Sequence, residues 1–289
     1  MNPTFSVVIP VYNGAETLEE TLLSALAQDF TDREIIVVND GSTDATPELF
    51  ATVKSEHPGQ NLILVEQPQA GLGAARNRGI QEASGHYIAL LDADDIWPEA
   101  KLSSCYEALQ NMPDCDVLYH PVHTFGLGRE RSRPVNAPLT LEKLLQGPNP
   151  LVPSATVLRR ALLLENPFTE EERYAGAEDL HLWIRLLSQG AQFRAWPDTY
   201  SYYRETGGMS SRLEEHLRKV FAVLNDLYEQ DYFPKRNLEE ARRRKFMEAG
   251  RFYHKRGQNQ RSEFYYSAAD SKSLKILGLR ILNWLGVKI

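Results

Sequence analysis

Four apolar runs in the amino-terminal part of the chain are each followed by a polar turn and a helix-like segment, and this alternation constrains the fold most. The runs span residues 5–12, 34–39, 62–65 and 86–91. Apolar runs of this length without polar alternation are typical of strands buried on both faces, as in parallel sheets. Strands that alternate with helices predict an α/β fold, with a mostly parallel sheet, right-handed crossovers and flanking helices.

The polar turns after these strands are expected to meet at one edge of the sheet. In open parallel sheets, ligands bind outside the carboxyl ends of the strands. Tyr12, Asp40, Gly71 and Asp92 stand at those ends. We therefore expect these residues to lie together and to line a ligand site.

The fourth run ends in a cluster of carboxylates, Asp92, Asp94 and Asp95. If the extended backbone continues, the two-residue period of a strand puts Asp92 and Asp94 on one face and Asp95 on the other. Two converging carboxylates repel each other unless a divalent cation lies between them, and ligation by oxygen alone suits Mg²⁺ or Mn²⁺. The alternative is that Asp94 or Asp95 caps the helix that Pro98 opens.

The stretch Asp40-Gly-Ser-Thr-Asp44 follows the second strand. A carboxylate at this edge can accept a hydrogen bond from a pyrimidine N–H or from ribose hydroxyls, and the glycine lets the backbone approach a ligand closely. The same stretch is also ordinary turn chemistry, so alone it does not establish a nucleotide site.

The stretch from Gly71 to Gly79 starts a helix with glycines and carries Arg76 and Arg78. Free backbone N–H groups at a helix start and guanidinium groups both suit phosphate. The glycine spacing matches neither the dinucleotide fingerprint nor the Walker pattern. For Arg78, a solvated helix face is the simpler account.

Two adjacent acids, Glu178 and Asp179, begin a helix predicted over residues 177–187. Adjacent residues of a helix point about 100° apart, so the two carboxylates cannot share one task. An acid in the first turn is stabilised by the helix dipole without any catalytic role. The functional alternative makes Asp179 a general base that takes a proton from an acceptor hydroxyl.

Together, these stretches resemble the family-2 glycosyltransferases, inverting enzymes that use nucleotide sugars and have a GT-A fold. The matching stretches occur in the family's order and cover roughly residues 5–210. They are Val7–Asn13, Val38–Asp44, Gly73–Asn77, Leu90–Asp95 and the pair Glu178-Asp179.

The resemblance implies a role for each matching residue. Asp40 would contact the nucleotide base, Asp94 would coordinate a metal on the diphosphate, and Asp179 would be the catalytic base. The residues expected to contact the nucleotide sugar are Pro10, Val11, Tyr12, Asp40, Gly71, Arg76, Asp92, Ala93 and Arg204, and those expected to bind Mn²⁺ or Mg²⁺ are Asp92 and Asp94. The cation would neutralise the charge that grows on the leaving nucleoside diphosphate.

One segment departs from the family's pattern. Members often carry Tyr-Arg followed by a histidine before a small, polar turn, whereas this chain has Tyr203-Arg204-Glu205-Thr206. Threonine is a poorer metal ligand than histidine, while Arg204 can still pair with phosphate. The chain also lacks a Gln-x-x-Arg-Trp motif and membrane helices, which argues against a processive polysaccharide synthase.

Helical periodicity continues after residue 211, and we predict a GT-A domain at 1–211 with a helical C-terminal extension at 212–289. Residues 236–270 are typical of a single helical hairpin of the tetratricopeptide kind, which is expected to pack on the catalytic domain. The tail at 271–289 interleaves cations with leucine, isoleucine and tryptophan. That pattern suits a helix in a membrane interface, or a helix docked on the core or on a second subunit, which we rank ahead.

The composition limits the partners and the compartment. With 32 basic and 39 acidic residues, the overall charge does not favour a nucleic-acid partner. The two cysteines are too few for a disulfide framework, which indicates a reducing compartment, and the start of the chain lacks a signal-peptide pattern. We expect a cytoplasmic protein, which would be peripheral on the inner face of the cell membrane if the tail binds lipid. Both a monomer and a homo-oligomer are compatible with the sequence.

The expected reaction moves a sugar from a nucleoside diphosphate, with UDP preferred, to a hydroxyl of a cell-envelope glycan, polysaccharide or lipid-linked acceptor. Two alternatives stay open. A nucleotidyltransferase would need a glycine-rich, basic loop after the first strand, and residues 12–16 are neither. A non-catalytic carbohydrate- or partner-binding module on a degenerate transferase scaffold would not need Asp92, Asp94 and Asp179.

Overall fold

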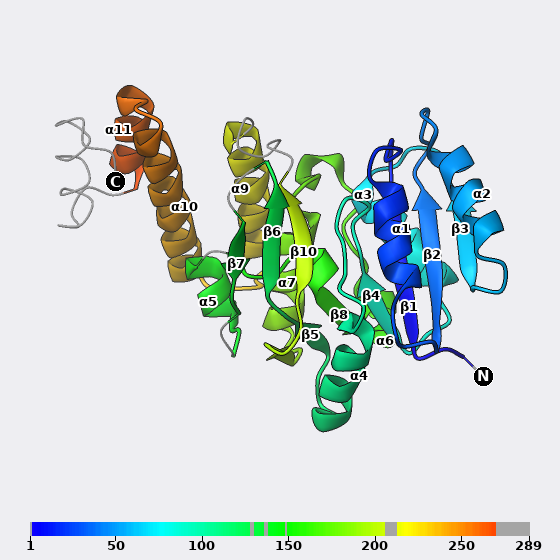
Figure 1. The fold of residues 1–289 in the computed structure, drawn as a ribbon. Helices are drawn as coiled ribbons and strands as arrows, with labels where there is room; N and C mark the ends of the chain where they lie inside the picture. The colour runs from blue at the N-terminus through cyan, green and yellow to red at the C-terminus, as the bar shows by residue number, and fades with distance from the viewer. Residues whose placement is uncertain (1, 128–129, 136–137, 148, 206–212, 270–289) are drawn as a thin grey trace.

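A seven-stranded sheet runs through the middle of the protein, seen in a computed structural model that describes residues 2–127, 130–135, 138–147, 149–205 and 213–269 (Figure 1). Its strands, in spatial order, are β3 (Leu62–Glu66), β2 (Arg33–Asn39), β1 (Phe5–Val11), β4 (Tyr87–Leu90), β8 (Thr156–Arg159), β5 (Val117–Tyr119) and β9 (Phe193–Ala195). Neighbours pair in parallel except at β8, which is antiparallel to both β4 and β5. The predicted α/β fold with a mostly parallel sheet is confirmed.

Helices join the first four strands, as the alternation predicts. They are α1 (Leu18–Leu26), α2 (Thr46–Glu56) and α3 (Leu72–Glu82), and α4 (Lys101–Asn111) follows β4. Every residue of β1 and β2 is buried. Val7 and Ile9 belong to one core cluster with residues of α1, α2 and α4, whereas Val8 belongs to a second cluster with Ile80 of α3. Helices α1, α2 and α4 therefore cover one face of the sheet, and α3 covers the other.

A second, three-stranded sheet has the order β10 (Ser201–Glu205), β6 (Val122–Gly126) and β7 (Arg131–Arg133). The glycine, arginine and proline residues of the stretch 121–138 predict a loop, and that prediction is wrong for β6 and β7. β6 pairs in parallel with β10, so its partner is distant in the sequence and local composition does not reveal the pairing. A bridge between Ile96 and Tyr202 joins this sheet to the loop after β4.

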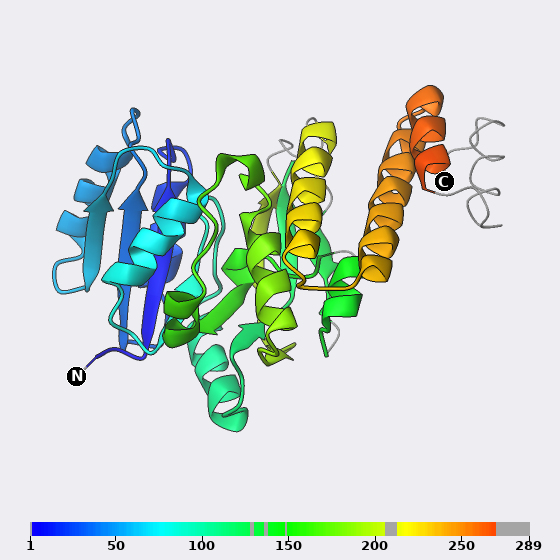
Figure 2. The same ribbon diagram turned by 180° about the vertical axis from the view of Figure 1, so that it is seen from behind.

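Further helices occur in the described chain between β7 and β10. They are α5 (Leu141–Gln146), α6 (Arg160–Glu165), α7 (Glu178–Ser188) and the 3₁₀ turns η1 (Pro153–Ala155) and η2 (Glu172–Tyr174). α7 contributes Leu182 and Ile184 to the same core cluster as α3. Figure 2 shows α3 and α7 on the same face of the main sheet. The start of α7 is thereby brought to the loops that follow β3 and β4.

The described residues 213–269 form α9 (Leu213–Glu229), α10 (Lys235–Lys255) and α11 (Asn259–Ala268). Val220, Val223 and Leu227 of α9 belong to the core cluster that also contains α7. Both views place α9 between the α/β body and the α10–α11 pair (Figures 1 and 2). Among the residues described, no helix is long and apolar enough to span a bilayer. The interface-helix prediction for residues 271–289 and the question about Thr206 lie outside the described residues.

Candidate active site

The loops after β1 and β2 are locked together at the carboxyl edge of the sheet. Asn13 has a positive φ of 51°, and its N–H donates to Ser42 Oγ at 2.9 Å. This turn leaves Tyr12 46% exposed. Pro10 and Val11 are buried in β1, where they pair with β2. Of the three β1-end residues predicted to line the nucleotide pocket, Tyr12 alone presents an exposed side chain.

The carboxylate of Asp40 organises the loop that leads into α3. Asp40 is buried, and its oxygens accept hydrogen bonds from Gln67 Nε2 at 2.7 Å and from the N–H groups of Ala70 and Gly71, both at 2.8 Å. Gly71 ends this loop with a φ of +93°, which only glycine adopts easily. Asp40 therefore holds the start of α3 next to the loop after β2.

Arg76 of α3 forms a buried bridge between two other segments. Its guanidinium donates to Asp92 Oδ1 at 2.8 Å and to Glu178 Oε1 at 2.7 Å, and its side chain is only 1% exposed. Burial alone would lower the pKa of Arg76, but the charges of Asp92 and Glu178 raise it above its ordinary value. The sequence expectation was a phosphate contact; in this structure, such a contact would require one of these ion pairs to break.

Asp95 anchors the loop after β4 through buried hydrogen bonds. It is fully buried, and it accepts hydrogen bonds from Ser154 Oγ at 2.6 Å and from the Arg204 N–H at 2.9 Å. Burial, followed by the neighbouring carboxylate charges, raises the pKa of Asp95 well above its usual range. The helix after this loop begins at Lys101 without a side-chain cap, so the capping alternative for Asp94 and Asp95 is wrong.

Asp94 and Arg204 lie together where the second sheet meets the loop after β4. Arg204 Nε donates to the Asp94 carbonyl at 2.7 Å, and its guanidinium lies 4.4 Å from the Phe125 ring centre. The same guanidinium also pairs with Glu20 of α1 at 2.5 Å. Asp94 is half-buried, and burial together with the charge of Asp92 raises its pKa. The Arg204 guanidinium could therefore bind an anion that lies next to Asp94.

The positions of Asp92 and Asp94 fit part of a site for the predicted divalent metal. The pKa of Asp94 is raised in part by Asp92, which is the repulsion that a divalent cation would relieve. In the part of the chain that the structure describes, no group of three or more His, Cys, Asp or Glu residues could hold an ion. Mg²⁺ and Mn²⁺ commonly take the rest of their oxygen ligands from substrate phosphates and water. Asp92 and Asp94 could therefore supply two ligands of a site whose remaining ligands come from substrate phosphates and water.

The adjacent acids of α7 have different surroundings. Glu178 is buried, and besides Arg76 its carboxylate accepts from the Gly176 N–H at 2.6 Å. Asp179 is half-buried and accepts from the Leu180 N–H at 2.7 Å. Burial and then the Glu178 charge raise the pKa of Asp179 to about 7, against the opposing effect of Arg76. A carboxylate with a pKa near 7 suits a general base at neutral pH.

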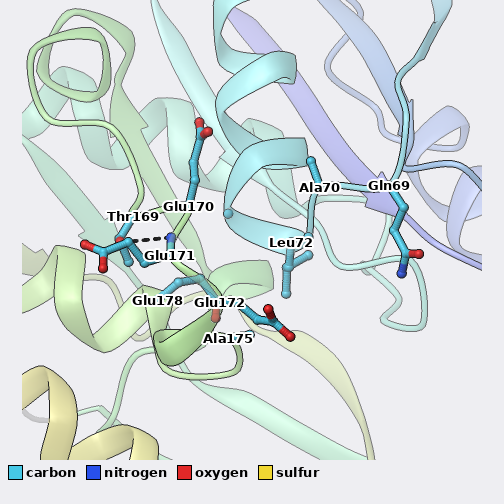
Figure 3. A pocket seen from close by; sticks show the side chains of 11 residues that line it. Gln69, Ala70, Leu72, Thr169, Glu170, Glu171, Glu172, Ala175 and Glu178 are labelled. Atoms are coloured by element: carbon cyan, nitrogen blue, oxygen red, sulfur yellow. Dashed lines mark hydrogen bonds between the residues drawn. The ribbon is translucent and has the colours of Figure 1, made fainter.

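A pocket of about 410 Å³ opens between residues 69–73 and residues 169–178 (Figure 3). Figure 3 shows acidic side chains along its wall beside the start of α3. These are Glu170, Glu171, Glu172 and Glu178. We call this hollow the acidic pocket. It adjoins the first turn of α7, in which Asp179 lies.

Close contact between α3 and the segment 168–170 shapes this pocket, and the sequence did not reveal it. Asn77 donates to the Phe168 carbonyl at 2.9 Å and to Glu170 Oε1 at 2.8 Å. A Cβ atom on Gly73 would lie 2.2 Å from the Thr169 carbonyl oxygen, so only glycine permits the approach. Gly73 and Asn77 both stand in a motif that carried the family resemblance, which was the available signal.

Residues 6–165 match the sequence profile "Glycosyl transferase family 2". The chain therefore belongs to glycosyl transferase family 2. This assignment confirms the predicted family and sets the nucleotidyltransferase alternative aside.

Curated relatives agree with the family assignment. The amylovoran biosynthesis glycosyltransferase AmsB of Erwinia amylovora is 35% identical over 202 residues, which cover 66% of this chain and 66% of that protein. The uncharacterized glycosyltransferase YibD of Escherichia coli (strain K12) is 40% identical over 123 residues, covering 40% of this chain and 34% of that protein. The chain thus spans about a third to two thirds of the length of these relatives.

Solved structures share the fold. Staphylococcus aureus TarS 1-349 in complex with UDP-GlcNAc has a TM-score of 0.66 at 21% identity, covering 99% of this chain and 87% of that chain. The mannosyltransferase PcManGT of Pyrobaculum calidifontis, in complex with GDP-Man and Mn²⁺, has a TM-score of 0.66 at 19% identity, covering 99% and 80%. The predicted GT-A fold is confirmed.

Proposed function

We propose that this protein transfers a sugar from a nucleoside-diphosphate sugar to an acceptor hydroxyl with inversion at the anomeric carbon. The observation that carries the proposal is the buried Arg76 bridge, since it fixes Asp92 of the donor edge beside the first turn of α7. This bridge supports the proposal that the donor carboxylates and Asp179, whose pKa is raised to about 7, serve one site.

The donor is proposed to be a UDP-sugar. TarS has been crystallised with UDP and with UDP-GlcNAc, and PcManGT with GDP-Man, so the fold accommodates more than one nucleotide. Asp40 is assigned to the base and exposed Tyr12 to its ring face. Asp40 Oδ2 accepts one hydrogen bond within the protein, which leaves this oxygen capacity for a pyrimidine N–H.

Asp92 and Asp94 are proposed to hold Mn²⁺ or Mg²⁺. When bound, the cation neutralises charge on the leaving diphosphate. Arg204 is assigned to the same diphosphate, exchanging its ion pair with Glu20 for a phosphate oxygen. Ala93 and Gly71 are assigned to backbone contacts with the donor.

Asp179 is proposed to be the catalytic base. Its carboxylate takes the proton of the acceptor hydroxyl while that oxygen attacks the anomeric carbon opposite the nucleoside diphosphate. The glycosidic bond forms as the bond to the diphosphate oxygen breaks. A single displacement inverts the anomeric centre and needs one carboxylate, whereas glycoside hydrolases use a pair.

The acceptor is proposed to belong to a cell-envelope glycan, a polysaccharide or a lipid-linked saccharide. Two relatives carry names of this kind, AmsB in amylovoran biosynthesis and the putative teichuronic acid biosynthesis glycosyltransferase TuaG of Bacillus subtilis. TuaG is 26% identical over 232 residues.

The donor assignment is tested by thermal unfolding with UDP, GDP, CDP and TDP, each with and without Mn²⁺. Ligand at a hundred times its dissociation constant adds about 2.7 kcal/mol to the native state. At roughly 2–4 °C per kcal/mol, the midpoint rises by several degrees. We expect the shift with UDP, dependent on Mn²⁺ and lost in Asp94→Ala. If no nucleotide shifts the midpoint, the non-catalytic binding module becomes the better account.

The base assignment is tested with Asp179→Asn. This variant should keep the Mn²⁺-dependent UDP shift and lose transfer by about 10²–10⁴-fold, the usual contribution of general base catalysis. Because the carboxylate must be ionised, wild-type kcat should rise with pH through about 7 and level off above it. Normal turnover by Asp179→Asn would contradict the assignment of Asp179 as the catalytic base.

A further inference from the structure

The chain just before α7 packs on α9 of the helical extension. Residues 171–177, which we call the 171–177 turn, contain η2 and lead directly to Glu178 and Asp179 in the first turn of α7. α9 contacts both η2 and α7, and Figure 2 shows α9 beside α7. The segment that carries the proposed base therefore has tertiary partners in the extension.

Tyr174 is the buried centre of this contact. Its side chain is fully buried in the core cluster to which α7 and α9 both contribute. Its ring stacks on the His181 ring of α7, with centres 5.2 Å apart and an angle of 24° between the planes. The Tyr174 carbonyl accepts a hydrogen bond from the Ala177 N–H at 2.7 Å. Tyr174 thus holds residues on both sides of Asp179.

Two polar side chains of α9 hold the same turn. The Asp226 carboxylate lies 3.4 Å from the Arg173 guanidinium. The same carboxylate lies beside the Tyr174 hydroxyl, since burial, followed by Asp226, raises the pKa of Tyr174. His216 makes a hydrogen bond with the Gly176 backbone, and burial lowers the pKa of His216, so its ring is neutral at pH 7. Ten residues of helix separate His216 from Asp226, about 15 Å, so α9 holds the turn at two distant points.

The start of α7 has little local support of its own. The first N–H groups of a helix have no partner within the helix, and Ala177 at the N-cap position offers no side chain to accept from them. The Glu178 carboxylate accepts from the Gly176 N–H at 2.6 Å and from Arg76, which also pairs with Asp92. A displacement of the 171–177 turn would therefore move the first turn of α7 relative to the donor edge.

We propose that α9 positions the catalytic base, with His216 and Asp226 as the positioning residues that hold the 171–177 turn and thereby Asp179. This inference rests on the proposed function and adds two residues to it. Both residues act through the turn rather than on the substrate. The inference also makes α9 part of the catalytic unit, although the family resemblance covers only residues 5–210.

A double-mutant cycle between α9 and the base tests this inference. The assay is Mn²⁺-dependent release of UDP from UDP-GlcNAc, with water in place of the acceptor hydroxyl. His216→Leu and Asp226→Ala should each lower kcat about ten- to hundredfold, because a base displaced by about 1 Å loses this much, and should leave the KM for UDP-GlcNAc unchanged. In an Asp179→Asn background the same substitutions should have no further effect, because residues that act through one group are not additive.

Conservative and control variants complete the cycle. His216→Asn and His216→Gln each place an amide N–H near one of the two ring nitrogens, so one of them should recover the wild-type rate. The matched controls are His57→Leu, at a half-buried histidine after α2, and Asp114→Ala, at an aspartate paired with Arg194. Both controls should release UDP like wild type.

Hydrogen exchange of the protein alone separates this inference from the proposed function. In His216→Leu and Asp226→Ala, the amides of residues 176–181 should exchange at least about tenfold faster, while those of β1 and β2 exchange as in wild type. If wild type releases no UDP, the proposed function fails, whereas faster exchange at 176–181 would still support α9 as the element that holds this turn.

Four outcomes would overturn the inference. The first is unchanged exchange at residues 176–181 in both α9 variants. The second is equal acceleration in β1 and β2, which would make the effect a general loss of stability. The third is the same fractional loss of UDP release with Asp179 and with Asn at that position. The fourth is failure of both amide variants to recover the rate that His216→Leu loses.

Discussion

Arginine–carboxylate pairs have different surroundings in the α/β body and in the helical extension. In the body, the Arg76 side chain is 1% exposed and pairs with Asp92 and Glu178 from two distant segments. In α10, the Arg244 side chain is 37% exposed and pairs with Glu248 one turn away. The first arrangement joins distant segments, whereas the second joins neighbouring turns of one helix. The comparison teaches that the site lies where charges are buried and bound across segments.

The largest expected effect comes from removing a buried pair in one region and an exposed pair in the other. Arg76→Met leaves two carboxylates without their cation and should lower the free energy of unfolding by about 3–5 kcal/mol. Arg244→Met should lower it by less than about 1 kcal/mol. Urea unfolding measures both. Equal losses in the two variants would remove the distinction between the regions, and Arg76→Lys tests whether charge alone is enough.

A smaller effect is expected at two helix glycines. On Gly73 a Cβ atom would lie 2.2 Å from the Thr169 carbonyl oxygen, and on Gly250 it would lie 2.4 Å from the Tyr266 ring. Overpacking of this kind costs about 1–3 kcal/mol, so both alanine variants should lose stability. Gly73→Ala should also lose transfer activity, because it displaces the wall of the acidic pocket. Gly250→Ala should keep its activity per folded molecule, measured by kcat at a temperature where both variants are folded.

The smallest effect is a gain. Lys101 is fully buried, its Nζ has no hydrogen-bond partner among the described residues, and burial lowers its pKa to about 8. The centre of the Trp97 ring lies 3.6 Å from Nζ, a cation–π contact that compensates for part of the burial. Lys101→Met should therefore stabilise the protein by about 1 kcal/mol at neutral pH. Lys245→Met, which removes the pair of Lys245 with Glu248, should not.

The direction of the pH dependence checks the Lys101 assignment. Between pH about 8 and 10.5 the unfolded chain keeps a proton that the folded chain has lost, so wild-type stability should rise with pH across this window. Lys101→Met lacks that rise, and the two unfolding curves should converge as pH increases. A constant difference between them would contradict the assignment.

The body was largely predictable because its signals are local. Strands such as Phe5–Val11 are apolar throughout, and the polar residues at their ends meet because parallel strands share a carboxyl edge. β6 was missed because its pairing with β10 is distant in the sequence. The same limit applies to Asp95, whose partners Ser154 and Arg204 come from other segments.

The candidate site shows this limit most clearly at Arg76. From sequence, an arginine near a glycine-bearing helix start is most simply solvated or bound to phosphate, because an unpaired charge is costly to bury. Its burial depends on Glu178, which is 102 positions away. Pairs of this kind are decided by tertiary packing, so the residues were identifiable but their partners were not.

The three hydrogen bonds to Asp40 have a consequence for the entropy of binding. They order residues 67–71 through contacts within the protein itself, so the loop's conformational freedom is already lost on folding. A nucleotide that reaches this edge meets a loop it does not have to immobilise, and less of its interaction energy is consumed by ordering. The aspartate proposed to face the base thus acts first on the chain itself, as a constraint that makes donor binding closer to a rigid docking event.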